Sequence, residues 1–201
     1  MSIFLQLYQG VMKHEGGYNP NDQGAPAYRG INRKYHPDWR GWQMLDKLNK
    51  KKGDVYTQLE PVVQEFYQAF WKPVRVDELN SLQVAQLLVD MRTQHGGWAK
   101  IVNAGVNGGD PFKVAAKYDT AMIKIINSDP GLYHRKIAEA RLYYSTHVPL
   151  KNEADRKSII ARAKSFLSQA VEFVKQEPVA TGLGIGFIVS LFVAYQLLKR
   201  N

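Results

Sequence analysis

A run of 20 residues without a charged side chain occupies positions 179–198, close to the end of the 201-residue chain. A helix of that length is about as long as the apolar core of a bilayer is thick. A buried core helix, the alternative, would normally be shorter and carry a polar stripe, so the run predicts a transmembrane helix. Gly182 and Gly186 have the GxxxG spacing of helices that approach closely, so self-association through this helix is a further expectation.

Residues 1–177, ahead of this segment, are expected to form one globular domain, because a chain of this size with 45 % hydrophobic content can bury one sizeable core but hardly two. The absence of cysteine excludes disulfides and thiol chemistry. The net charge of +9 favours polyanionic partners, meaning nucleic acid, anionic lipid or acidic wall polymers. No recognition motif for nucleic acid accompanies that charge, so we expect no specific nucleic-acid partner.

The spacing of apolar residues predicts a mostly α-helical domain. Residues 1–12 lack the regions of a signal peptide and instead show an amphipathic helix that begins after Ser2. Residues 16–53 have no long period and are expected to be loop and short strand. Further helices are predicted near 59–70, 82–91 and 152–176, and the pairs Asp110-Pro111 and Asp129-Pro130 are typical helix starts.

The segment from His14 to Tyr18, HEGGY, stands at the end of the expected first helix. It begins like the zinc motif HExxH, but Tyr18 takes the place of the second histidine, so no metal site is predicted. Glycines after a glutamate can simply end a helix, which is the structural alternative. A carboxyl group near a helix C-terminus is disfavoured as an anion, which raises its pKa. Glycoside hydrolysis needs such a protonated carboxyl group and no metal or cofactor, so Glu15 is the candidate general acid.

Most glycosidases pair the acid with a second carboxylate that acts as base or nucleophile. Asp22 is the nearest candidate in the sequence, although a glycine-rich loop is also where an ordinary turn aspartate occurs. Asp38 is the substitute candidate. Aromatic residues that could stack on sugars gather around these carboxylates, and core packing is the alternative for the two tryptophans. The four rings predicted to bind substrate are Tyr18, Tyr28, Trp39 and Trp42.

The residues from His14 to Tyr18, then Asp22-Gln23-Gly24, then Tyr28-Arg29-Gly30-Ile31, together resemble the N-terminal signature of glycoside hydrolase family 108. Members of that family are lysozyme-like muramidases of phages and bacteria. The likeness continues over 33–42 and 67–71, includes Asp90, and extends more weakly over 98–167. It implies a lysozyme-like, α-rich fold for residues 1–177, with 98–177 as its helical peptidoglycan-binding half, and it implies that Glu15 is the catalytic glutamate.

The chain departs from the family pattern at several positions. Ala25 and Ala27 stand where the family usually has a glycine and a threonine, and Gln94 and His95 replace an asparagine and a small residue. By the resemblance, the threonine hydroxyl can orient the attacking water. Its absence leaves three alternatives open: a hydrolytic muramidase, a lytic transglycosylase that closes the sugar on itself, and a non-catalytic module of a virion that binds the wall or supports a membrane assembly.

The expected membrane segment also bears on where the protein acts. A muramidase must meet peptidoglycan outside the cytoplasm, yet the sequence begins without a signal peptide, and its expected anchor lies at the C-terminal end. A virus particle that contains a lipid membrane would resolve this conflict. We therefore expect a phage lysis or entry enzyme in the virion membrane, with the host inner membrane as the alternative, and with peptidoglycan and lipid as partners.

Overall fold

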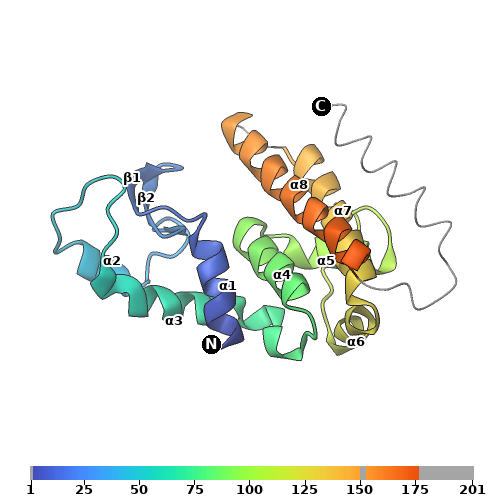
Figure 1. The fold of residues 1–201 in the computed structure, drawn as a ribbon. Helices are drawn as coiled ribbons and strands as arrows, with labels where there is room; N and C mark the ends of the chain where they lie inside the picture. The colour runs from blue at the N-terminus through green and yellow to red at the C-terminus, as the bar shows by residue number, and fades with distance from the viewer. Residues whose placement is uncertain (1, 150–152, 177–201) are drawn as a thin grey trace, which may run out of the picture. The chain divides into compact units, whose positions relative to one another are not determined.

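The computed structural model describes residues 2–149 and 153–176 (Figure 1). The chain forms two compact units, Met1–Glu78 and Leu79–Asn201. The described residues are mostly helical, as the periodicity predicts. The division lies ahead of the position near Trp98 at which the sequence places the start of the helical half. None of the helices in 2–149 and 153–176 is long and apolar enough to cross a membrane, and the expected span over 179–198 lies outside the described residues.

Two helices frame the first unit. Helix α1 (Ile3–Met12) begins as expected at Ser2, whose hydroxyl accepts a hydrogen bond from the backbone N–H of Leu5 at 3.3 Å. Helix α3 (Glu60–Trp71) follows the 3-10 turn η1 (Thr57–Leu59), and it packs on α1 through aromatic pairs such as Tyr8 with Tyr67, whose ring centroids are 6.0 Å apart. The short elements α2 (Gly41–Leu45), η2 (Lys72–Val74) and η3 (Val76–Glu78) complete the unit.

A three-stranded antiparallel sheet follows α1, and its order is β1-β2-β3. Strands β1 (Tyr18–Asp22), β2 (Ala25–Tyr28) and β3 (Ile31–Asn32) are joined by two-residue turns. In the first turn Gln23 and Gly24 have φ values of 54° and 85°, and in the second Arg29 and Gly30 have 50° and 75°. Positive φ at both central residues is the requirement of the type I′ hairpin. The expectation of short strands over 16–53 is therefore confirmed, although the range also contains the short helix α2.

Five helices build the second unit over its described residues, 79–149 and 153–176 (Figure 1). Helix α4 (Leu82–Gln94) and the long α8 (Glu153–Gln176) agree with the predicted periodicity. Helix α7 (Pro130–His147) begins at the predicted Asp129-Pro130 pair, and the Asp129 carboxylate accepts from the N–H of Leu132 at 2.9 Å. Helices α5 (Trp98–Asn107) and α6 (Thr120–Ser128) lie between α4 and α7 in the chain.

The helix start predicted at Asp110-Pro111 is wrong. The Asp110 carboxylate does accept from the N–H of Phe112 at 2.9 Å, but the chain makes only a turn there. The next helix begins ten residues later, where Asp119 caps α6 by accepting from the N–H of Met122 at 2.9 Å. The aspartate-proline pair favours a first turn, but most of residues 112–117 are exposed, so tertiary packing does not stabilise a longer helix there.

A buried ionic cluster ties three helices of the second unit together. Asp90 of α4 pairs with Arg141 of α7 and with Arg162 of α8, whose Nε donates to the carboxylate at 2.7 Å. Arg141 is fully buried and Asp90 nearly so. The position of Asp90, which the resemblance placed in a helix that ends in a turn, is thus structural in this unit. His95 closes α4 beside the cluster, and burial lowers its pKa to about 4, helped by the charge of Arg141.

Candidate active site

Glu15 lies three residues beyond the end of α1 and is partly buried. The sequence placed it at the helix end, where the helix dipole would act on its carboxyl group. The effect of the helix dipole falls off within the last turn of the helix. The residues packed around Glu15 therefore determine the environment of its carboxyl group instead. The following Gly17 is required by close packing, since a Cβ there would stand 2.3 Å from the carbonyl oxygens of Gly53 and Asp54.

The carboxyl group of Glu15 packs against the backbone of Gly30, in the turn between β2 and β3. A Cβ added at Gly30 would stand 2.5 Å from Oε2 of Glu15 and 2.7 Å from the hydroxyl oxygen of Tyr67. Real Cβ atoms do not approach other atoms so closely, so the missing side chain makes room for both groups. Gly30 also needs its positive φ for the hairpin. The Glu15 carboxyl group and the Tyr67 hydroxyl are thus neighbours over one glycine.

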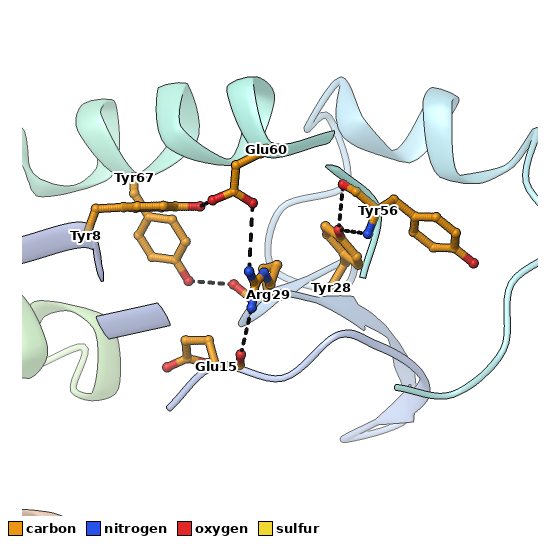
Figure 2. Close-up of polar contacts among 7 residues, drawn as sticks. All are labelled: Tyr8, Glu15, Tyr28, Arg29, Tyr56, Glu60 and Tyr67. Carbon is orange, nitrogen blue, oxygen red and sulfur yellow. Dashed lines mark hydrogen bonds and ion pairs between the residues drawn. The ribbon is translucent and has the colours of Figure 1, made fainter. Parts of the chain in front are cut away.

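Arg29 holds the backbone on both sides of this contact. Its Nη1 donates to the carbonyl oxygen of Glu15 at 3.3 Å, and its own carbonyl oxygen accepts from the hydroxyl of Tyr67 at 2.7 Å (Figure 2). Arg29 has a left-handed φ of 50°, which is uncommon outside glycine and asparagine. The turn therefore depends on these tertiary contacts, which fix Glu15 with respect to Gly30 and α3.

The guanidinium of Arg29 is held in turn by a carboxylate of α3. Nη2 lies 3.8 Å from Glu60, and Glu60 accepts a hydrogen bond of 2.6 Å from the hydroxyl of Tyr8 on α1 (Figure 2). Burial raises the pKa of the Tyr8 phenol well above its usual range, and the bond to Glu60 adds to the effect. Tyr8 is therefore a donor at every physiological pH. The network joins α1, α3 and the β2–β3 turn around the Glu15 loop.

Asp22 ends β1 at the first hairpin turn and is held by an amide. Nδ2 of Asn32 donates to Oδ2 of Asp22 at 3.0 Å and to its backbone oxygen at 2.6 Å. Oδ1 of Asn32 accepts from the N–H of Lys34 at 2.8 Å, so the buried amide is fixed at both ends. Asp38, the substitute candidate, is exposed. A restrained, partly buried carboxylate is better suited to a catalytic role than an exposed one.

Ala27, which stands at the place of the family's threonine, lies at the centre of the sheet. It pairs with Asn19 of β1 on one side and with Asn32 of β3 on the other, and it is 6 % exposed. Side chains of directly paired residues share one face of a sheet. A hydroxyl at position 27 would therefore lie on the face of Asn32, the residue that holds Asp22.

Three of the four rings expected to stack on sugars are buried instead. Tyr28 has no exposed surface, and its hydroxyl accepts from the N–H of Tyr56 at 2.9 Å. Trp42 is 2 % exposed and Trp39 is 9 % exposed, and each donates its indole N–H to a backbone carbonyl. A ring covered by protein cannot stack on a sugar in this conformation, so core packing replaces the expected sugar contact for these three. Tyr18 is partly exposed, with Nζ of Lys50 5.8 Å from its ring centroid, and it stays a candidate for substrate contact.

Sequence reasoning missed Arg29, Asn32, Glu60 and Tyr67 as parts of the site. The pair Arg29-Gly30 between two short apolar segments is a weak hairpin signal that could have drawn attention to the turn. The partners from α3 carry no local signal, because Tyr67 and Arg29 are 38 residues apart in the sequence and Tyr8 and Glu60 are 52 apart.

Comparison with known proteins gives one family match. Residues 8–96 match the model of the family described as glycosyl hydrolase 108. No curated protein matches the chain. The matched residues include Glu15, the two hairpins and all of α3, so the family assignment covers every candidate site residue. Residues 8–96 are thus similar to the glycosyl hydrolase 108 family, and a domain of that family supports a glycosidase that acts on peptidoglycan.

Proposed function

We propose that the chain is a lysozyme-like muramidase in which Glu15 is the general acid and Asp22 the second carboxylate. The observation that carries the proposal is the packing of the Glu15 carboxyl group over Gly30, beside the hydroxyl of Tyr67. A general acid must carry a proton at working pH and must be held beside its substrate, and Glu15 lies partly buried among protein groups. The backbone of Glu15 is held by Arg29, so its carboxyl group can be presented to substrate in a fixed position.

In the proposed reaction the proton of Glu15 passes to the oxygen of the glycosidic bond as the bond from that oxygen to C1 breaks. A water molecule supplies the oxygen that ends on C1, and its proton returns to a carboxylate. Asp22 either takes that proton from the water or first attacks C1 itself, according to the separation of the two carboxyl groups. Asn32 keeps one oxygen of Asp22 engaged and leaves the other for this step.

Lytic transglycosylation is the second candidate, and Ala27 is the observation that favours it. Without a hydroxyl at position 27, no side chain there can orient the attacking water. The C6 hydroxyl of the muramic acid sugar can then replace water at C1, which closes a 1,6-anhydro ring and releases the same leaving group. General acid catalysis by Glu15 is common to both reactions.

Mass analysis of the fragments released from purified peptidoglycan distinguishes the two. Reducing muramic acid ends indicate hydrolysis, and anhydro ends indicate transglycosylation. The variant Ala27→Thr should raise the share of reducing ends and the hydrolytic rate, because its hydroxyl would lie on the sheet face of Asn32 and Asp22. An unchanged rate and product ratio would mean that position 27 does not contact the attacking water.

We also propose that the segment 179–198 anchors the enzyme in a membrane. The support is its length of 20 residues without a charge, and the basic charge of the whole chain, which suits an anionic lipid surface. The membrane of a phage particle would deliver the enzyme to the wall of a new host, and the host inner membrane is the alternative. Fractionation of purified particles tests this. Release of the protein only when detergent dissolves the bilayer supports a virion enzyme, and its absence from particles contradicts it.

A further inference from the structure

The second unit contains an open cavity that the proposed reaction does not use. It lies beside α5 and α7 and the turn that follows α5, and its volume of about 340 Å³ is within the range of small-ligand sites, roughly 300–1,000 Å³. Small residues line much of it, so backbone forms a large part of the wall. The lining includes Ala104, Gly105, Gly109, Lys136, Ala140 and Tyr143.

The wall contributed by α7 is one face of that helix. Lys136, Glu139, Ala140 and Tyr143 follow each other at the spacing i, i+3, i+4, i+7, which places them in one stripe. The stripe that begins with His134 and Ile137 is buried in the unit. The helix therefore presents a polar and aromatic stripe to the cavity and a separate stripe to the core.

Close packing of the two helices creates the floor. A Cβ added at Gly105 of α5 would stand 2.7 Å from Cα of Ile137 on α7, so the helix backbones approach closely there. The turn after α5 needs two glycines with positive φ, and at the second, Gly109, φ is 105°. Larger residues at these positions would shift the helices or the turn.

Two charged groups of the stripe can still form hydrogen bonds to a ligand. The Glu139 carboxylate has Arg135 as its ion-pair partner among the described residues, with Nε 3.8 Å away. The side chain of Glu139 is 46 % exposed, so its carboxylate can be reached by a ligand, while partial burial raises its pKa. Lys136 donates to the carbonyl oxygen of Val106 over a long 3.4 Å and has two further protons to donate. An acceptor and a donor thus stand one turn apart at the wall.

An exposed ring adjoins the two charges. Tyr143 is 44 % exposed, and its ring stacks on His147 with centroids 4.2 Å apart. Phe112, which is 37 % exposed, lies at the turn with its centroid 6.4 Å from that of Tyr143. Amphipathic rings that are supported on one side and open to solvent are suited to the apolar face of a sugar.

We propose that this cavity binds an N-acetylated amino sugar of the glycan strand. The acetamido group offers one N–H and one C=O, which match the acceptor Glu139 and the donor Lys136, while the pyranose ring lies on Tyr143. Phosphate or another anion fits less well, because two carboxylates, Asp110 and Glu139, line the cavity beside one lysine. This inference rests on the proposed function only in that peptidoglycan is taken as the source of the sugar. A sugar bound here would tether the enzyme to its substrate.

The test is calorimetric titration of the full-length Glu15→Gln protein with a β-1,4-linked tetramer of N-acetylglucosamine. Because the candidate active site can also bind this tetramer, we expect two bound molecules per chain. Ala140→Leu in the same background fills the cavity and should leave one. Tyr143→Ala removes an exposed ring and should weaken the second binding event about tenfold. Ala161→Leu, on an exposed face of α8, is the matched control and should keep both.

The ligand class is tested with two further titrations, using a glucose tetramer, which lacks the acetamido group, and a stem tetrapeptide that contains a diamino acid. Neither compound should bind in the cavity, so Ala140→Leu should not change its binding. Equal tetramer binding by Ala140→Leu and Ala161→Leu, or cavity binding of the peptide in place of the sugar, would overturn the proposal. Since all these proteins already carry Glu15→Gln and only binding is measured, a failure of the catalytic assignment would leave this result unaffected.

Discussion

The carboxyl group of Glu15 occupies the space that a side chain at Gly30 would fill, with Oε2 only 2.5 Å from the position of the missing Cβ. This contact joins the loop after α1 to the β2–β3 turn. It also explains why the same glycine serves two purposes, since the hairpin needs its positive φ and the carboxyl group needs its lack of a side chain.

Gly30→Ala should therefore lower activity and stability by more than the strain of a positive φ alone would. The added methyl group would displace the Glu15 carboxyl group and the Tyr67 hydroxyl, so we expect at least about a tenfold loss of turnover and a destabilisation of roughly 1–3 kcal/mol. Gly24→Ala is the matched control, because Gly24 has a similar φ of 85° but no atom within 4 Å of its added Cβ. Unfolding in urea and release of soluble fragments from peptidoglycan measure the two effects. Equal losses in both variants would mean that strain alone is responsible.

The ion pair of Arg29 and Glu60 should act on the site as one unit. Arg29→Lys keeps the charge but loses the fork that reaches both Glu15 and Glu60, and we expect a cost of about 1 kcal/mol in stability with a several-fold loss of activity. Arg33→Lys alters the exposed pair with Asp46 and should change little. A double variant of Arg29→Lys with Glu60→Gln should show a coupling energy of about 0.5 kcal/mol or more. If the stability losses of the two single variants simply add in the double variant, the two residues do not belong to one network.

Asp22→Asn should lower activity without unfolding the protein, because the amide can neither accept the proton of water nor attack C1. Asn32→Ala should lower it less, since the carboxylate stays but loses the amide that holds it. The comparison variant is Asp38→Asn, at an exposed position, which should retain activity. If Asp38→Asn is the impaired variant and Asp22→Asn is not, the second carboxylate has been assigned to the wrong residue.

The second unit should lose stability as the pH falls from about 6.5 to about 4. The pKa of buried His95 is lowered to about 4, so the unfolded chain binds its proton at higher pH than the folded chain does. The stabilisation is therefore fully present above pH 6.5 and is lost through this window, on the order of 2–3 kcal/mol for this histidine. The free energy of unfolding of His95→Gln should depend less on pH there, whereas the exposed control His147→Gln should follow the wild type. If the free energy of unfolding of all three proteins has the same pH dependence, His95 is not the cause of the loss of stability.

Helical periodicity predicted α1, α3, α4 and α8 because each has an apolar stripe that is visible in the sequence, and the pair Asp129-Pro130 predicted the start of α7. The capping pair at Asp110 was misleading, because the residues after it are mostly exposed and no packing extends the first turn into a helix. Sequence reasoning also misjudged Tyr28, Trp39 and Trp42, because aromatic residues in irregular segments have no period that separates a buried ring from an exposed one.

The candidate site, too, could be predicted only in part from the sequence. The resemblance pointed to Glu15, which lies within the segment 8–96 that matches the family model, and its catalytic role stays a prediction. The groups that hold Glu15 in place come from α1, α3 and the β2–β3 turn, and their contacts span up to 52 residues of sequence. Such contacts are set by tertiary packing and not by any local pattern.

The most direct test of the catalytic assignment is the rate at which Glu15→Gln releases soluble fragments from purified peptidoglycan. The amide matches the carboxyl group in volume and cannot donate the required proton, so the rate should fall at least about a hundredfold while the unfolding curve stays that of the wild type. Glu65→Gln, which changes an exposed glutamate of α3, is the control and should remain fully active. A Glu15→Gln protein that is folded and degrades the wall at nearly the wild-type rate would contradict the assignment of Glu15 as the general acid.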